Sequence, residues 1–408
     1  MIILNSYADA ESADCVARQV LESVRRLLDE FPEPNRDGGV ELRRAQFDAG
    51  LAWVHFPIGR GGLGLPPEYQ AVVDRELARA GVVDVRLENN IGHGNAAPIL
   101  VRYGTDAQCN RFLRPCFTNE EVWCQLMSEP GAGSDIAGLA TRAQRDGDVW
   151  LVNGQKVWTT LAHTARWGLL VARHAPEVPK HAGLTCFVVD MREPGVEVRP
   201  LRQMTGRAEF NEVFLSDVRV PDEHRVGDVG AGWAVVMSTL QSERMFTLAV
   251  DDEANACDDL LEAWNRAGRP SSRQRDVVNA WIAVRVNELI ALRAGAVSSG
   301  GAPGPDAAVI KVRVSESTQA AAELAVDLSG AEGMLYPSGY DLGRPRSVSG
   351  ADLDLHQRCL NARGGTIAAG TSQIMRNVLG ERVLGLPREP RVDLGIPWRD
   401  VPREGRST

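Results

Sequence analysis

Apolar side chains recur three or four residues apart in the first third of the chain. The spacing is that of one face of an amphipathic helix, and it is seen at Leu21, Val24, Leu27, Leu28 and Phe31. This pattern predicts a helix over residues 8–31, and similar patterns predict helices over 69–80 and 97–103. Residues 1–120 are therefore expected to form a helical domain.

The pattern changes between residues 122 and 221. Short β-branched and aromatic runs such as LTCFVVDM and VEVRPL alternate with Gly, Pro, Asn and Asp. Runs of this length and composition are typical of antiparallel strands joined by turns. Residues 121–225 are expected to form a β domain.

Helical spacing returns in the last third, after the glycine-containing loop GDVGAG. Helices are predicted over residues 233–266, 273–298, 306–329 and 371–384, with Gly268, Arg269 and Pro270 breaking the first two. Residues 226–390 are expected to form a helix bundle. The tail over 391–408 is predicted to be mobile.

Composition and charge limit the class of protein. The chain has 408 residues, 44% of them hydrophobic, and a formal net charge of −9, which fits several globular domains and gives no general basis for binding nucleic acid. No apolar run is long enough for a membrane helix, and the N-terminus lacks the pattern of a signal peptide. A cytoplasmic protein that contacts no membrane is expected.

Cysteine and histidine spacing gives no sign of a metal site. The seven cysteines are scattered without CxxC, and the histidines show neither HxxxH nor HExxH. Reduced, mostly buried thiols and no bound metal are expected. His163 follows the WTT motif, where it is either close to a cofactor or a structural hydrogen-bonding residue.

The run Gly59-Arg60-Gly61-Gly62-Leu63-Gly64 matches the dinucleotide-binding pattern GxGxxG. In that site a helix must begin inside the glycine run so that its N-terminus meets the pyrophosphate. Here Pro66 and Pro67 place the next helix start after the last glycine. We interpret the run as a tight turn instead.

Two polar motifs suggest a site for a planar heterocycle. The segment from Ser128 to Asp135, SEPGAGSD, can expose backbone N–H groups, and Val157-Trp158-Thr159-Thr160 adds an aromatic face and a hydroxyl on a strand. A buried tryptophan in a β core is the structural alternative.

With these motifs in view, the sequence resembles the acyl-CoA dehydrogenase family. The resemblance rests on WCQLMSEPGAGSDIAG, NGQKVWTT, FNEVFLSDVRVP and IAAGTSQIMRNVLGERVLGLP, in the family's order, and covers roughly residues 10–388. It implies a multi-domain fold of α and β parts, with a helical N-terminal domain, a middle antiparallel β-barrel and a C-terminal four-helix bundle. The implied cofactor is FAD.

The resemblance also assigns cofactor contacts. Ser134 would approach both FAD and the thioester of the substrate, and Thr160 would lie near the flavin N5. The remaining implied FAD contacts are Gln125, Met127, Ser128, Trp158, Thr371 and Gln373. The family's RxxFG, which reaches the neighbouring subunit's FAD, is absent; Arg266, Arg273 or Gln274 could replace it, or this basic turn is simply solvated.

The catalytic glutamate of many family members is also missing, because the corresponding run reads Ile367-Ala368-Ala369-Gly370-Thr371-Ser372. The backbone N–H of Ala369 would still polarise the thioester carbonyl, with Gly370 beside it at the substrate. The small Ala368-Ala369 pair suggests room for a branched or bulky acyl group.

Glu243 is the candidate replacement base. By helical spacing it shares a nearly uncharged face with Val236, Thr239, Phe246, Thr247 and Val250. Burial there would raise its pKa toward a working value. The isovaleryl-CoA and long-chain branches of the family place their base here. A structural glutamate is the alternative, and Arg244 would either contact substrate or anchor the helix.

Together these features predict an FAD-dependent enzyme that converts an acyl-CoA, or an acyl carrier protein thioester, to the trans-2-enoyl thioester. The resemblance implies an electron-transfer flavoprotein as electron acceptor and a homodimer or homotetramer. Three alternatives remain open: a base-deficient subunit of a heteromeric dehydrogenase, a flavin oxidase or monooxygenase on the same fold, and a non-enzymatic acyl-CoA binder.

Overall fold

A computed structural model describes the backbone of residues 2–247, 252–298, 306–336, 342–350, 353–391 and 393–402. The side chains of residues 2–13, 242–254, 294–298 and 306 lie outside the description. The chain divides into two compact units, Met1–Trp123 and Cys124–Thr408. Among the described residues, no helix is long and apolar enough to cross a membrane.

The first unit is helical, as the sequence predicts. Its helices are α1 (Ile2–Glu30), α2 (Val40–Asp48), α3 (Gln70–Arg79), α4 (Ala97–Tyr103) and α5 (Asp106–Phe117). Val20, Val24 and Leu27 of α1 are buried against side chains of α2 and α3. Helix α5 was not predicted, although a capping box in which Thr105 and Gln108 exchange hydrogen bonds marks its start.

The glycine run at residues 59–64 is a turn, which confirms the interpretation. The N–H groups of Ala52 and Trp53 donate to the carbonyl of Gly61 at 3.1 and 3.0 Å. Gly61 has φ +81°, and a Cβ on Gly62 would lie 2.1 Å from the carbonyl oxygen of Phe56. The next regular helix begins only at Gln70. These glycines serve close backbone packing.

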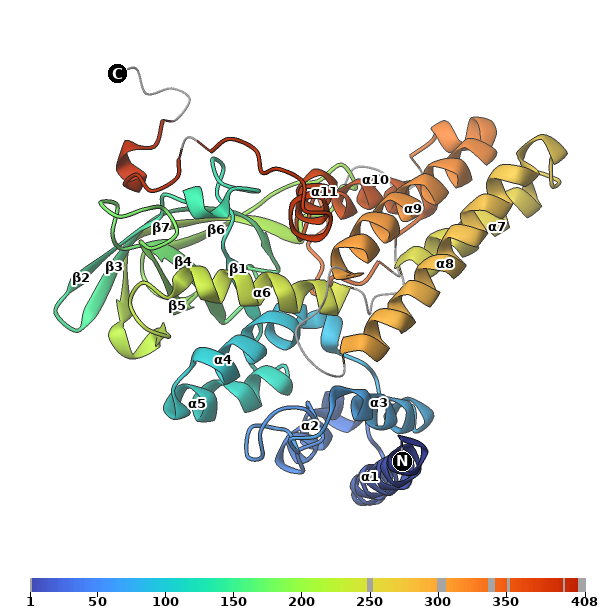
Figure 1. Cartoon of the computed structure of the whole chain (residues 1–408), viewed down its shortest axis with the longest axis horizontal. Helices are drawn as coiled ribbons and strands as arrows, with labels where there is room; N and C mark the ends of the chain where they lie inside the picture. The colour runs from blue at the N-terminus through green and yellow to red at the C-terminus, as the bar shows by residue number, and fades with distance from the viewer. Residues whose placement is uncertain are drawn as a thin grey trace. The chain divides into compact units, whose positions relative to one another are not determined.

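The second unit begins with an eight-stranded sheet (Figure 1). Its strands are β1 (Trp123–Leu126), β2 (Arg142–Asp146), β3 (Val149–Thr160), β4 (Trp167–Arg173), β5 (Leu184–Asp190), β6 (Val196–Pro200), β7 (Phe210–Pro221) and β8 (Arg225–Val226). The order is β6-β7-β3-β2-β4-β5-β8, with β1 beside β4. The β2–β3, β3–β7, β4–β5, β5–β8 and β6–β7 pairs are antiparallel, and β2 and β4 make one parallel contact, Arg142 with Arg173.

The core of this sheet explains why its strands form where they do. Alternate residues of β3, such as Trp150 and Val152, point inward and are buried with Val218 and Val220 of β7. Every residue of β4 is buried, so this strand is covered on both faces. The sheet thus provides a rigid support for the loops at its ends.

Helices make up the rest of the second unit. They are α6 (Gly232–Thr247), α7 (Asp252–Arg266), α8 (Gln274–Ser298), α9 (Asp306–Leu328), α10 (Leu355–Gly365) and α11 (Ser372–Val378). In Figure 1, α7, α8 and α9 run side by side around a shared apolar core that includes Leu260 and Ala325. The helix predicted over 233–266 is described as two helices, with residues 248–251 outside the description.

The prediction for the tail was wrong for residues 393–402. The N–H of Trp398 donates to the carbonyl of Val178 at 2.8 Å, and the N–H of Arg399 donates to that of Pro176 at 3.0 Å. Pro397 also forms an isolated β-bridge with Pro179. Partners more than 200 residues away in the sequence fix this segment, so local composition could not reveal it.

Candidate active site

A β-bulge turns Trp158 out of the sheet. Along the β3–β7 pair, Lys156 faces Val213 and Thr159 faces Asn211, so Val157 and Trp158 together oppose one residue. Trp158 has φ +60°, and its side chain is 57% exposed. The ring packs edge-on against Phe210 at 5.9 Å between centroids. This geometry leaves an indole face available for a planar ligand.

The segment after β1 lies directly beside this tryptophan. The N–H of Val157 donates to the carbonyl of Ser128 at 2.9 Å. Met127 is buried, and its sulfur accepts a hydrogen bond from the Gln125 amide at 3.2 Å. The structure therefore brings the implied contacts Gln125, Met127 and Ser128 together with Trp158.

Lys156 fixes this arrangement from inside the sheet. Its side chain is fully buried, and its ammonium donates to the carbonyls of Met127 and Val171 and to the Glu129 carboxylate at 2.9–3.0 Å. Three acceptors require three donor hydrogens, so the group is charged. Burial lowers the pKa of Lys156, and attraction to Glu129 offsets part of that effect.

Glu129 is the matching anion. Its carboxylate also accepts hydrogen bonds from the N–H groups of Ala140 at 2.6 Å and Thr141 at 2.8 Å. Burial opposes its charge, but Lys156 and these N–H groups outweigh burial and hold the pKa of Glu129 below its usual value. The motif reasoning from sequence did not identify this ion pair, whose partners are 27 residues apart.

The turn between Glu129 and Asp135 offers hydrogen-bond donors to a ligand. Glu129 and Ala132 exchange two backbone hydrogen bonds of 3.0 Å that close the turn. Within the described part of the chain, the N–H groups of Gly131, Gly133 and Ser134 donate no hydrogen bond. Space beside both glycines is open, and Ser134 is exposed. An exposed indole and outward N–H groups fit a flavin and its polar edge.

Thr160 and His163 lie at the end of β3. Thr160 pairs with Phe210 across the sheet and is partly exposed. His163 uses both ring nitrogens, with Nε2 2.9 Å from the Pro345 carbonyl and Nδ1 3.3 Å from the Asn211 amide. Burial lowers the pKa of His163, which favours the neutral ring that these partners require. The geometry supports the structural interpretation of this histidine.

The run at residues 367–371 forms a left-handed turn before α11. Ala369 has φ +53° and Gly370 has φ +98°. In the described backbone, the N–H groups of Ile367, Ala368 and Ser372 each donate a hydrogen bond, whereas that of Ala369 donates none. Thr371 caps α11, because its hydroxyl accepts from the N–H of Ile374 at 3.1 Å. Gln373 is the second residue of α11 and is exposed.

Helix α6 carries Glu243 and Arg244 in its last turns. Their side chains lie outside the described residues. The two preceding turns are described: Val236 and Thr239 are fully buried, and α6 packs against β4 and β5. Residues four apart share a helix face, so Glu243 follows directly on this buried stripe.

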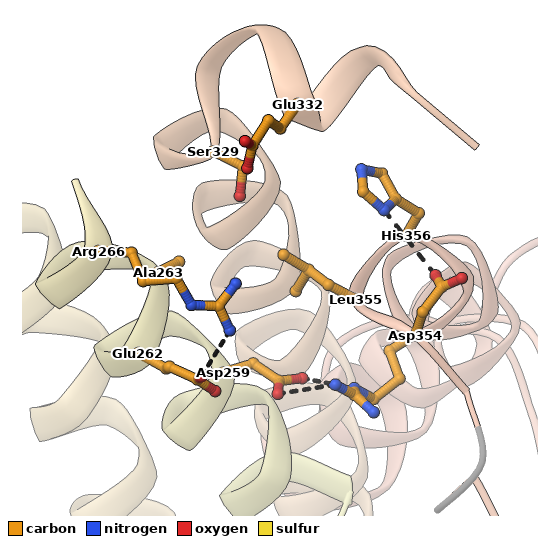
Figure 2. Close-up of a pocket in the computed structure, with 10 residues that line it drawn as sticks. Asp259, Glu262, Ala263, Arg266, Ser329, Glu332, Asp354, Leu355 and His356 are labelled. Carbon is orange, nitrogen blue, oxygen red and sulfur yellow. Dashed lines mark hydrogen bonds and ion pairs between the residues drawn. The ribbon is translucent and has the colours of Figure 1, made fainter. Parts of the chain in front are cut away.

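Arg266 lies in a polar pocket of about 260 Å³ between the ends of α7, α9 and α10 (Figure 2). Four carboxylates and two guanidinium groups line it, from Asp259, Glu262, Glu332, Asp354, Arg266 and Arg358. Arg266 pairs with Glu262 at 2.5 Å, and Arg358 makes a two-pronged contact with Asp259. The excess of carboxylates disfavours a phosphorylated ligand.

Arg273 and Gln274 lie at the start of α8, and both are exposed. Arg273 pairs with Asp327 of α9. The structure therefore places Arg266, Arg273 and Gln274 on the helix bundle, whereas Trp158 and its neighbours lie at the sheet. Whether the three contact FAD stays a prediction.

Comparison with known proteins agrees with this geometry. Models of the acyl-CoA dehydrogenase N-terminal, middle and C-terminal domains match residues 12–120, 124–218 and 230–384. Acyl-CoA dehydrogenase FadE34 of Mycobacterium tuberculosis is 40% identical over 343 residues, which are 84% of this chain and 45% of FadE34. Acyl-CoA dehydrogenase IpdE1 of the same organism is 40% identical over 349 residues, 84% of this chain and 86% of IpdE1.

The crystal structure of the ChsE4-ChsE5 complex from Mycobacterium tuberculosis has a chain with a TM-score of 0.69 and 27% identity. The match covers 92% of this chain and 98% of that one. The chain belongs to the acyl-CoA dehydrogenase family, which confirms the resemblance seen in its motifs. Members of this family are FAD-dependent oxidoreductases that act on acyl-CoA.

Proposed function

We propose that this protein catalyses the α,β-dehydrogenation of an acyl-CoA with a branched or bulky acyl group, giving the trans-2-enoyl-CoA. The observation that carries the proposal is the exposed face of Trp158 beside the outward N–H groups of the 129–135 turn. FAD, when bound, supplies the acceptor for the substrate's β-hydride. The remaining tasks fall to groups of this chain.

Activation of the thioester is assigned to the backbone of Ala369. Its N–H has no acceptor among the described hydrogen bonds, and the left-handed turn fixes its direction. A preset N–H donor stabilises the negative charge that develops on a thioester oxygen when the α-proton leaves. The N–H therefore makes the α-proton more acidic.

Removal of that proton is assigned to Glu243. Its carboxylate takes the α-proton, and the electron pair of that C–H bond becomes the π bond between Cα and Cβ. The electron pair of the β-C–H bond leaves with its hydrogen as a hydride, for which bound FAD would be the acceptor. The buried stripe of Val236 and Thr239 supports a dry setting for the next turn of α6. Such a setting raises the pKa of a carboxyl group toward neutrality.

The preference for bulky acyl groups rests on the small side chains of Ala368 and Ala369. Ala368 is exposed, the neighbouring Ile367 is 64% exposed and Ala369 is half-buried, so both alanines are at least partly open to a ligand. Replacing either alanine by a larger residue should reduce turnover of branched substrates more than that of straight ones.

Product analysis tests the function. The purified protein, given FAD, an artificial electron acceptor and a panel of straight and branched acyl-CoAs, should form a product two mass units lighter than its substrate. Glu243→Gln should slow this reaction by about 10²–10⁴-fold. Equal rates for the variant and the wild type would show that Glu243 is not the base. Equal rates on straight and branched acyl-CoAs would contradict the proposed preference for branched or bulky acyl groups.

A second candidate is a subunit of a heteromeric dehydrogenase. Arg266 and Arg273 pair with carboxylates of their own chain, and the Arg266 pocket has more carboxylates than guanidinium groups. Both features are unfavourable for an FAD pyrophosphate from a neighbour. One related structure is the ChsE4-ChsE5 complex. FAD content well below one per chain in the purified homo-oligomer would favour this candidate.

The exposed surface of α8 supports assembly into an oligomer, either with further copies of this chain or with a different chain. An apolar stripe on this helix is exposed at helical spacing, formed by Val278, Trp281, Ile282, Leu289 and Leu292. Light scattering on the purified protein should give at least a dimer. Electron transfer to an electron-transfer flavoprotein, rather than to oxygen, is part of the proposal and predicts slow oxygen consumption during turnover.

A further inference from the structure

The far half of the 127–141 loop is attached to a buried arginine. Arg173 of β4 is 2% exposed and donates to the carbonyls of Ala137 at 2.6 Å and Leu139 at 3.0 Å. It also donates to the carbonyl of Lys180 at 3.1 Å. The guanidinium therefore ties residues 137–139 to the sheet and to the loop that follows β4.

Lys180 holds the acidic end of the same turn. Its ammonium lies 2.7 Å from both carboxylate oxygens of Asp135, next to Ser134, and 2.5 Å from the carboxylate of Asp393. Lys180 is 7% exposed. A residue near the C-terminus and a residue beside the proposed thioester contact thus share one buried cation.

Residues 393–401, named here the C-terminal strap, complete this attachment. The indole N–H of Trp398 donates to the carbonyl of Gly138 at 3.1 Å. The Arg173 guanidinium lies over the Trp398 ring, 4.2 Å from its centroid. Figure 1 shows the strap, in red, beside the sheet. The strap therefore contacts both the 135–139 segment and the arginine that supports it.

We propose that the C-terminal strap positions the Ser134 turn for binding of the acyl-CoA thioester, with Trp398 and Asp393 as positioning residues that act through Arg173 and Lys180. The inference rests on the proposed function, because that function makes Ser134 a substrate contact.

The turn needs such support because, apart from the buried Ala132, its residues Gly131, Gly133 and Ser134 are exposed. Positions Gly131 and Gly133 have no atom within 4 Å of where a Cβ would be. Glycine-containing backbone that is free to move loses entropy when it binds a ligand, and prior fixation avoids that loss. Lys156 fixes one end of the loop, at Met127 and Glu129, and the strap fixes the other.

Hydrogen exchange and flavin reduction, both on the full-length FAD-bound protein, test the inference. Trp398→Ala removes the stacking and the hydrogen bond, Trp398→Phe removes only the hydrogen bond, and Arg399→Ala is the control. Arg399 belongs to the strap, but its side chain is 62% exposed and pairs with Asp400. The reporters are the N–H groups of residues 138–141, which donate within the loop.

Trp398→Ala should speed exchange at residues 138–141 by about 10-fold, given ordinary cation–π and hydrogen-bond strengths. It should raise the acyl-CoA concentration for half-maximal rate by about 5–10-fold, while the rate at saturation stays within about twofold. Trp398→Phe should fall between, and Arg399→Ala should match the wild type in both measurements.

Wild-type exchange in Trp398→Ala would overturn the inference, because the strap would then not hold the loop. Faster exchange with unchanged half-saturation would also overturn it, since the loop would not position substrate. If no acyl-CoA reduces the wild-type flavin, the proposed function fails on its own terms. In that case the exchange result alone decides whether the strap holds the loop.

Discussion

Replacement of Lys156 by methionine tests how much the buried ion pair contributes to the site. Methionine keeps the length and apolar stem of the side chain but removes an ammonium that satisfies three oxygens at 2.9–3.0 Å. The variant leaves the Glu129 carboxylate buried with only its two backbone N–H donors. Removing one member of a buried pair typically costs about 3–5 kcal/mol.

Because Glu129 keeps two hydrogen bonds, we expect a loss near the lower end, about 3 kcal/mol in the free energy of unfolding. Urea unfolding followed by tryptophan fluorescence and by circular dichroism measures it, provided that the two probes give the same transition. The control is Arg142→Met. Arg142 is exposed on β2, so its replacement should change stability by less than about 0.5 kcal/mol.

A double-mutant cycle separates the ion pair from general damage to the core. Glu129→Gln alone also leaves a buried partner without its counter-charge, whereas Lys156→Met with Glu129→Gln removes both charges. The double variant should therefore be less destabilised than the sum of the single variants, by about 1–3 kcal/mol. A Lys156→Met loss below about 1 kcal/mol, or strictly additive losses, would refute the reasoning.

Three further predictions follow from the site and the strap. Trp158→Ala should weaken FAD binding by about 3–10-fold because it removes an aromatic contact, and Trp158→Phe should retain most of the affinity; equal affinity in a fluorescence titration would contradict the placement of the flavin. Adding Ala369→Glu to Glu243→Gln should raise the turnover rate at least about tenfold over Glu243→Gln alone, because it returns a carboxylate to the turn that carries the thioester contact. No gain in a turnover assay would contradict the placement of the substrate's α-carbon beside this turn. Lys180 and Arg391 lower the pKa of Asp393 to about 2, below the unfolded value of about 3.9, so the stabilisation of the strap is complete above about pH 4 and is lost as the pH falls toward 2. Exchange at residues 138–141, compared at matched intrinsic rates, should thus be constant from pH 7 to 5, and acid release of the strap should be absent in Asp393→Asn.

Local patterns were enough to predict much of the fold. The helix over 97–103 and the turn at residues 59–64 depend on spacing within a few residues, and the structure places both as predicted. The start of α5 also has a local signal, the capping box of Thr105 and Gln108. Helices and turns could thus be predicted from the sequence wherever residues close together in the chain determine them.

Long-range contacts explain what the sequence did not reveal. Lys180 forms an ion pair with Asp393, 213 residues away in the sequence, and Trp398 donates a hydrogen bond to Gly138, 260 residues away. One clue was present: the chain has three lysines among 45 basic residues, and all three are buried. An ammonium places three donors around one point, which suits the oxygens at Lys156 better than a planar guanidinium.

Anaerobic titration of the FAD-bound protein with acyl-CoAs, followed by flavin absorbance, is the direct test of acyl-CoA dehydrogenation with Glu243 as the base. A branched or bulky acyl-CoA should bleach the wild-type flavin, and Glu243→Gln, with the same FAD content, should bleach at least about 100-fold more slowly. A flavin that no acyl-CoA bleaches, or a variant as fast as the wild type, would contradict it.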